Sequence, residues 1–157
     1  MRRLQDMIEA FARPGRLEGI WLRGARLAAP QGVDEAEVGP DGLSGDHARP
    51  GKRAVTLIQA EHLPVIAALA GRNGVTAAQL RRNLVVSGLN LNGLKGRRIA
   101  IGGVVLEVTI VCAPCSRMED ELGHGGYAAL RGHGGWCAQV VTPGPIRVGD
   151  AVTPLAG

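Results

Sequence analysis

The sequence predicts a mainly β fold, either a β-barrel or a compact sandwich-like arrangement of strands. Short apolar runs recur along the chain and indicate about eight strands. Glycine- and proline-containing turns separate these runs, and only a few short helical segments lie among them. The strands do not alternate with long helices, which argues against a βαβ fold with its parallel sheet.

The composition is typical of a soluble globular chain. Its 157 residues are 45% hydrophobic and 20% charged, and this length predicts one domain over 1–157 with a core over about 15–153. No apolar run approaches the roughly 20 residues of a membrane span, and no apolar segment follows the N-terminal arginines as it would in a secretory signal. Three cysteines are too few for a disulfide framework, so we expect a reduced, cytoplasmic protein.

The net charge of +4 comes almost wholly from arginine, since Lys52 and Lys95 are the only lysines in the sequence. Guanidinium groups bind phosphate and carboxylate oxygens, so this charge fits an anionic ligand, although a compositional bias toward arginine explains it equally. The arginines are scattered and aromatic residues make up only 3% of the chain. Both facts argue against nucleic-acid binding.

The first third of the chain predicts a helix, strands and a long loop. Apolar residues recur at helical spacing over 1–12, so we expect an amphipathic helix there. Residues 16–22 alternate as a strand does, and 25–29 are a candidate for another strand. The turn-rich stretch 30–52 predicts a long surface loop, and such loops often carry function. It contains Gly45-Asp46-His47.

The middle of the chain continues with short elements. Residues 53–58 predict a strand, and a helix over about 60–70 follows it. Thr76-Ala77-Ala78-Gln79 has the spacing of a capping box, which marks a brief helix start. Residues 84–86 predict a short strand, and 87–98 predict a loop.

Residues 99–111 predict a β-hairpin that leads into the most informative segment. Two apolar runs flank Gly102-Gly103, a dipeptide suited to the positive φ angles of a tight turn. Beyond the hairpin, Pro114 interrupts the sheet ladder and the acidic residues 119–121 suit the opening of a short helix. Cys115 thus lies between a strand end and a helix N-terminus, where backbone N–H groups stabilise a thiolate.

The last part of the chain predicts a glycine-rich segment and then short strands. The segment 123–135 holds His124 and His133, and its glycines fit either an anion-binding cradle or a mobile loop. The strands are expected at 136–141, 146–148 and 151–153.

The cysteines allow several interpretations. Cys112 and Cys115 form a Cys-x-x-Cys pair, but the βαβ unit of a redox motif is missing. A zinc site on this pair could recruit His124, His133 or Cys137, although a second closely spaced ligand pair is lacking. Cys112 continues the inward-facing parity of its strand, so we expect it in the core, and we expect Cys137 to be buried too.

Several short segments follow one another in a recognisable order: Gly45-Asp46-His47, Arg53-Ala54-Val55, Asn83-Leu84, Ile101 to Val108, Ala113-Pro114-Cys115, Gly134 to Ala138 and Ile146 to Asp150. Together they resemble a MOSC domain, which is found at the C-terminus of molybdenum-cofactor sulfurases and in small bacterial stand-alone proteins. The resemblance covers about residues 15–153. It is strongest at the strand-Pro-Cys element and at the final Gly-Asp turn.

The resemblance implies a MOSC-type β-barrel with a few short helices, and it makes Cys115 the reactive cysteine that carries a persulfide or ligates molybdenum. Relatives include the mitochondrial amidoxime-reducing component and bacterial proteins that detoxify N-hydroxylated purines. In these relatives arginine and asparagine side chains hold part of the pterin cofactor. By position, Arg53, Arg82 and Asn83 are the matching candidates here.

Two histidines complete the predicted site. His47 follows a Gly-Asp turn and either orients the site or satisfies local backbone groups. His133 lies among glycines whose backbone N–H groups could approach an anion. Asp46 and Asp150 are expected to form turns rather than act as acids or bases.

The expected function is that of a sulfur carrier or a molybdenum-cofactor-binding protein, with molybdopterin as cofactor and Cys115 as its thiolate. Such a protein would be a sulfur transferase or a molybdenum-cofactor-dependent reductase of N-hydroxylated substrates. No pyridoxal phosphate domain fits this length, so we expect a separate cysteine desulfurase or other sulfur donor as partner, and an anionic pterin or sulfur acceptor as ligand. The alternative is a non-catalytic binding module with a vestigial site, or a structural zinc site on Cys112 and Cys115.

Overall fold

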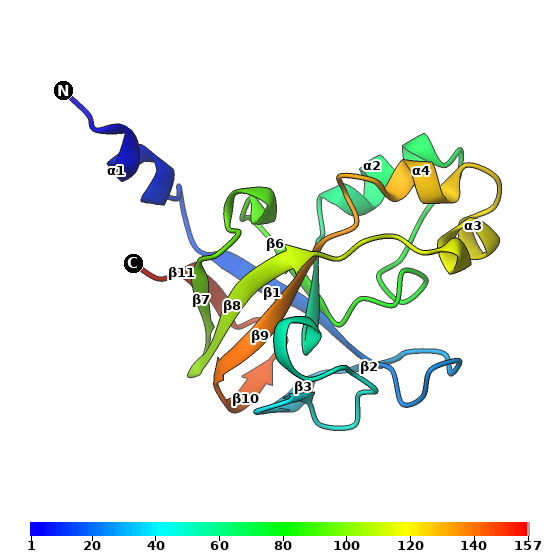
Figure 1. Cartoon of the computed structure of the whole chain (residues 1–157), viewed down its shortest axis with the longest axis horizontal. Coiled ribbons are helices and arrows are strands. Elements are labelled where there is room, and N and C mark those ends of the chain that lie inside the picture. Colours follow the sequence, from blue (N-terminus) through cyan, green and yellow to red (C-terminus); the bar gives the residue numbers. More distant parts are fainter. Residues whose placement is uncertain (157) are drawn as a thin grey trace.

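The computed structural model, which describes residues 1–156, is built on a closed β-barrel (Figure 1). One sheet has eight strands in the order β11-β7-β8-β9-β5-β6-β1-β2, and a further pairing of β11 with β1 closes all of them except β2 into a ring. The pairs are antiparallel except for β5 with β6. The strands are β1 (Gly15–Leu22), β2 (Gln31–Val33), β5 (Val55–Gln59), β6 (Leu84–Ser87), β7 (Arg98–Ile101), β8 (Val104–Val111), β9 (Trp136–Thr142) and β11 (Ala151–Pro154).

A second, smaller sheet packs on the barrel. It has the order β10-β3-β4, with β3 at Glu35–Gly39, β4 at Gly42–Leu43 and β10 at Gly144–Arg147. One residue of each strand, Val38, Leu43 and Ile146, is buried in the same hydrophobic cluster as the barrel interior. The small sheet therefore extends the barrel core rather than forming a separate unit.

Three helices cover the outer face of β5 and β6. Along these strands Leu57 and Leu84 point into the barrel cluster, while the neighbouring Ile58 and Val85 belong to a second cluster with helical residues. The covering helices are α2 (His62–Leu69), α3 (Ser116–Leu122) and α4 (Gly126–Leu130), and they gather on one side of the barrel (Figure 1). Within residues 1–156, no helix has the length and apolarity needed to cross a bilayer.

The remaining helical segments are short. The helix α1 (Leu4–Glu9) projects away from the barrel and buries none of its residues (Figure 1). The 3-10 segments η1 (Gly51–Arg53) and η2 (Leu91–Gly93) lie in loops. The predicted N-terminal helix is therefore present but shorter than 1–12.

The strand β8 shows why the chain forms a barrel. Val104, Leu106 and Val108 are fully buried and alternate with half-buried residues, as predicted for a strand with one face in a core. The register against β9 then shifts between Val108 and Val111, which marks a bulge. Beyond the bulge the alternation breaks down, and Val111 is exposed at the strand end.

The structure confirms the predicted fold class and the hairpin whose turn is Gly102-Gly103, and it corrects the predictions for two segments. The stretch 30–52, predicted as a loop, contains β2, β3 and β4. The stretch 25–29, a candidate strand, forms turns instead. The capping box forms, since Thr76 N donates to Gln79 Oε1 at 2.9 Å and Gln79 N donates to Thr76 Oγ1 at 3.2 Å, but it caps only a turn.

Leu106→Ala should test the barrel core. Leu106 is fully buried, so the truncation should lower the free energy of unfolding by about 2–5 kcal/mol through lost burial and the cavity left behind. Leu27→Ala is the control, because Leu27 is 82% exposed and its truncation should change stability by no more than about 0.5 kcal/mol. Chemical denaturation measures both, and equal effects would contradict a core centred on the barrel interior.

Candidate functional site

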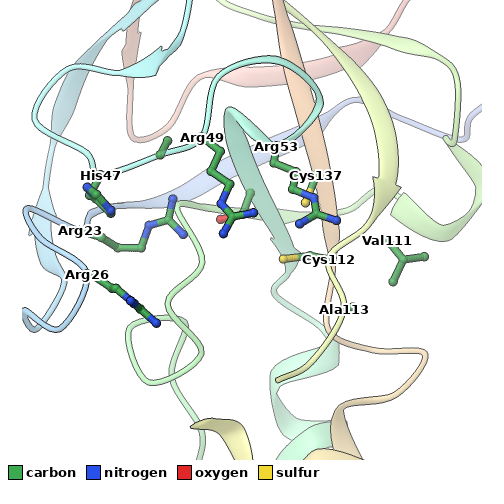
Figure 2. A pocket seen from close by; sticks show the side chains of 11 residues that line it. Arg23, Arg26, His47, Arg49, Arg53, Val111, Cys112, Ala113 and Cys137 are labelled. Atoms are coloured by element: carbon green, nitrogen blue, oxygen red, sulfur yellow. The ribbon is translucent and has the colours of Figure 1, made fainter. Parts of the chain in front are cut away.

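A pocket of about 330 Å³ opens where β8 leaves the barrel (Figure 2). Its walls come from the loop after β1, the segment before β5, the end of β8 and the start of β9. Arginine and cysteine side chains dominate these walls. The lining residues used below are Arg23, Arg26, His47, Arg49, Arg53, Cys112 and Cys137.

The bulge in β8 and a glycine directly before β9 place Cys112 at this pocket. Cys112 N donates to Gly135 O at 3.0 Å, which keeps the chain beside β9 after regular pairing ends. Gly135 has φ +90°, and a Cβ there would lie 1.9 Å from Leu57 O. Only glycine fits this position, because any side chain would push β9 away from β5. The close approach of the backbones thus fixes the wall that carries Cys112.

Cys112 and Cys137 lie on this wall as an interacting thiol pair. A hydrogen bond from Cys137 is the main cause that lowers the pKa of Cys112 to about 6; burial opposes this shift, and the charges of Arg82, Arg23 and Arg53 add to it. The same hydrogen bond and burial raise the pKa of Cys137. Both thiols are buried, as predicted, but Cys112 lines the pocket instead of joining either hydrophobic cluster. The pair favours a thiolate on Cys112 and a thiol on Cys137.

The charge of the pocket is unbalanced. Arg23 donates from Nη2 to Asp46 Oδ2 at 2.8 Å and from Nε to Asp46 Oδ1 at 3.1 Å, so this arginine is neutralised. Among residues 1–156, the guanidinium groups of Arg26, Arg49 and Arg53 form neither an ion pair nor a hydrogen bond. These three positive charges face the pocket without a carboxylate to match them, which favours an anionic ligand.

Asn83 supports the pocket from behind. It is fully buried, and its Oδ1 accepts hydrogen bonds of 3.0 Å from both N and Oγ1 of Thr56. Its Nδ2 donates to Trp21 O and to Asp46 Oδ1, each at 3.0 Å. Asn83 therefore joins β1, β5 and the loop that carries Asp46.

Arg82 is also buried and bonded to protein. It donates from Nε to Gly134 O at 2.7 Å, from Nη1 to Leu80 O at 2.8 Å and from Nη2 to Cys112 O at 3.3 Å. Neither Arg82 nor Asn83 lines the pocket, although both were predicted to contact a cofactor. Any influence they have on a ligand has to pass through the residues that they hold.

Cys115 occupies an adjoining hollow of about 420 Å³. It is exposed, and it is the N-cap residue of α3, which confirms its predicted place between a strand end and a helix start. The hollow shares Arg23, Arg26 and His47 with the first pocket and adds Arg81 and Arg117. The two hollows thus form one basic groove, with Cys112 in one part and Cys115 in the other.

Two arginines hold the loop that carries Arg26. Arg81 donates to Ala25 O at 3.1 Å and also to Ala28 O, and Arg117 donates to Arg26 O at 3.1 Å. Arg81 has φ +58°, a conformation that non-glycine residues rarely adopt and that is common at functional sites. Burial and the charges of Arg117 and Arg23 lower the pKa of Arg81. The groove is therefore built from crowded arginines.

Of the two histidines predicted for the site, only His47 lies in the groove. His47 lines both hollows of the basic groove, as expected of a site residue, and its backbone N–H bonds to Arg23 O. His133 does not line the groove. Its ring meets that of His62 edge to face with centroids 5.5 Å apart, and its buried Nδ1 has no hydrogen-bond partner.

The zinc alternative finds no support in the part of the chain that the structure describes. Over residues 1–156, no three His, Cys, Asp or Glu side chains gather closely enough to hold a metal ion. His124, one of the ligands considered for Cys112 and Cys115, is exposed and lies 3.7 Å from Glu119. The described residues therefore offer no ligand group for the alternative of a structural zinc site on Cys112 and Cys115.

The chain is thus a small closed β-barrel that carries cysteine thiols in a basic groove. The model of the MOSC domain matches residues 37–153, which is most of the chain, so the protein belongs to the MOSC domain family. The family membership that the sequence motifs predicted is thereby confirmed. No curated protein matches the chain.

Solved structures confirm the fold. The YuaD protein from Bacillus subtilis superposes with a TM-score of 0.80 at 20% identity, over 90% of this chain and 96% of that one. YiiM from Geobacillus stearothermophilus gives 0.76 at 18% identity, over 91% and 76%. YiiM from Escherichia coli gives 0.71 at 21% identity, over 90% and 70%. These identities establish a shared architecture and nothing finer.

Asn83→Ala should unfold more easily than the parent protein. It leaves Thr56 N and Thr56 Oγ1 without the buried oxygen that accepts their hydrogen bonds, which should cost about 2–3 kcal/mol. Ser87→Ala is the control, because it removes only an exposed hydrogen bond to Glu18 and should cost less than about 0.5 kcal/mol. Denaturant titration measures both, and a cost for Asn83→Ala no larger than the control would contradict the supporting role of Asn83.

The pH dependence of Cys112 alkylation should reflect the lowered pKa of this thiol. Only the thiolate reacts, so the rate of labelling by iodoacetate should rise with pH through a midpoint of about 6. Cys137→Ala removes the donor and should move the midpoint upward, whereas Cys137→Ser keeps a hydroxyl donor and should change it less. Peptide mass spectrometry across pH 5–9 reads the midpoint. A value near the ordinary thiol pKa of about 8.5 in the parent protein would contradict the pair.

Proposed function

We propose that this MOSC domain carries sulfur as a persulfide or binds a molybdenum cofactor, with Cys115 as the thiolate that does so. One observation carries the proposal: Cys115 is an exposed thiol at a helix start inside a groove whose arginine charges are unmatched. An exposed thiol can meet a sulfur donor or a metal centre. The arginines supply the attraction for an anion beside it.

The groove fits the chemistry of a molybdopterin. Its phosphate would find the free guanidinium groups of Arg26, Arg49 and Arg53, which line the pocket without internal partners. Cys115 offers the soft sulfur ligand that suits molybdenum. When bound, the metal centre would supply the redox chemistry of a reductase for N-hydroxylated substrates, while this chain would bind the cofactor and orient it.

Sulfur transfer would use the same thiol. The Cys115 thiolate attacks the outer sulfur of a donor persulfide, the donor's S–S bond breaks, and the donor leaves as a thiolate. The outer sulfur then remains on Cys115 as a persulfide, with no net oxidation or reduction. A cytoplasmic cysteine desulfurase is the donor we expect, and an anionic pterin or another sulfur acceptor would be held by the arginines of the groove.

The test uses protein made in a host with active molybdenum-cofactor synthesis, and the same protein incubated with a cysteine desulfurase and cysteine. Molybdenum and pterin contents measure cofactor binding, and peptide mass spectrometry locates a sulfur adduct. We expect the parent protein to hold either molybdenum with pterin or a sulfur adduct. Cys115→Ser should hold neither, because serine is neither a soft metal ligand nor a persulfide carrier.

Cys137→Ser is the matched control, since it replaces a buried cysteine and leaves Cys115 in place. It should keep most of the molybdenum or of the sulfur adduct. A parent protein that holds neither, or a Cys115→Ser variant that matches it, would refute the proposed function.

A further inference from the structure

The pocket beside Cys115 contains a second thiol site that the proposed function does not use. Cys112 directly follows the last residue of β8 and Cys137 lies in the adjacent β9, and Figure 2 shows both sulfur atoms on the pocket wall. The residue pairs Val108–Ala138 and Val111–Trp136 bracket the bulge opposite Cys137. Two thiols at a bulge therefore face the same pocket.

The surroundings favour a nucleophile at Cys112. Cys137 and the charges of Arg82, Arg23 and Arg53 lower the pKa of the Cys112 thiol and so favour its thiolate. The peptide N–H of Cys112 is already bonded to Gly135 O, which holds the residue in place. A preorganised thiolate on the wall of an open pocket can attack an electrophile bound there.

The same pocket selects the charge of that electrophile. Arg53 and Arg49 line it with free guanidinium groups, and Figure 2 shows both side chains extending into it. The carboxylate of Asp46 is fully buried and engaged by Arg23, so it does not repel an incoming anion. A small anion with oxygens spread over one end fits a pair of arginines, since each guanidinium can bind two oxygens.

We infer that Cys112 is itself a sulfur-accepting nucleophile, and that its substrates are small anionic sulfane-sulfur compounds of the thiosulfate type. The inference deepens the proposed function by naming a sulfur source, and it rests on that function only for the use made of the sulfur. It needs no second protein to deliver sulfur to this pocket.

The step balances without an oxidant or reductant. The Cys112 thiolate attacks the outer sulfur of thiosulfate and forms an S–S bond, while the bond between that sulfur and the sulfonate group breaks. The electron pair of the broken bond leaves with sulfite, whose charge Arg53 and Arg49 stabilise. Cys112 keeps the outer sulfur as a persulfide anion, which accepts the S–H hydrogen bond of Cys137. A thiolate or cyanide acceptor then takes this sulfur and regenerates the Cys112 thiolate.

The experiment mixes the purified protein with thiosulfate and measures the sulfite released. Without an acceptor, we expect close to one sulfite per chain and a sulfur adduct on the Cys112 peptide. With cyanide as acceptor, thiocyanate should form continuously. Cys112→Ser should abolish both signals, whereas Cys115→Ser should keep them.

Further variants test the inference even if Cys112→Ser does not fold. Arg53→Gln should raise the KM for thiosulfate about tenfold, because it removes one charged arm of the pocket. Arg147→Gln is the control, since Arg147 pairs with Glu35 on the exposed edge of β10 and should leave KM unchanged. Prior alkylation of Cys112 in the folded parent protein should block sulfite release.

The outcomes separate this inference from the proposed function. No sulfite from the parent protein, or a sulfur adduct on Cys115 instead of Cys112, would overturn the inference and leave molybdenum binding at Cys115 standing. Sulfite release that depends on Cys112, together with a Cys115 that takes neither metal nor sulfur, would uphold the inference and refute the proposed function.

Discussion

The basic groove depends on one buried carboxylate. Asp46 has a fully buried side chain, yet it accepts hydrogen bonds from Arg23 N, Arg23 Nε and Asn83 Nδ2 on one oxygen and from Arg23 Nη2 on the other. A buried charge with this many partners is stable only while each partner stays in place. The loop of Asp46, the end of β1 and the start of β6 are consequently held together at a single point.

This arrangement also makes the net charge of the groove positive. Asp46 pairs with Arg23, so the charges of Arg26, Arg49 and Arg53 stay unpaired at the pocket. The same charges act on the Cys112 thiol. Arg23 therefore holds the backbone through Asp46, whereas the pocket-lining arginines have no partner within the protein. Their guanidinium groups remain available for hydrogen bonds to an anion.

Part of this site could be predicted from local sequence. The alternation of Val104, Leu106 and Val108 predicted β8, and Pro114 with the acidic run behind it placed Cys115 between that strand and a helix. The stretch 30–52 was harder, because β2, β3 and β4 are at most five residues long and lie among glycines, so they show no clear period. The positions of the arginines in the sequence did not show which of them would be buried and which would line the pocket. Arg82 and Arg53 look alike in sequence, and only the closed barrel buries one and leaves the other in the pocket. Arg23, Arg26 and Arg49 were missed because barrel closure, not spacing along the chain, brings them to Cys112.

The seam of the barrel has a consequence for how the protein forms during synthesis. The ring closes through the pairs Gly15–Val152 and Arg16–Ala151, which join its earliest strand to its latest. On a ribosome, β1 is made before every other strand of the ring, and its partner β11 is made after all of them. During that interval it can pair with β6 but presents an open edge toward the missing β11. The cysteines of the groove lie on segments made before β11, so their thiols exist in an unclosed barrel until β11 has been made.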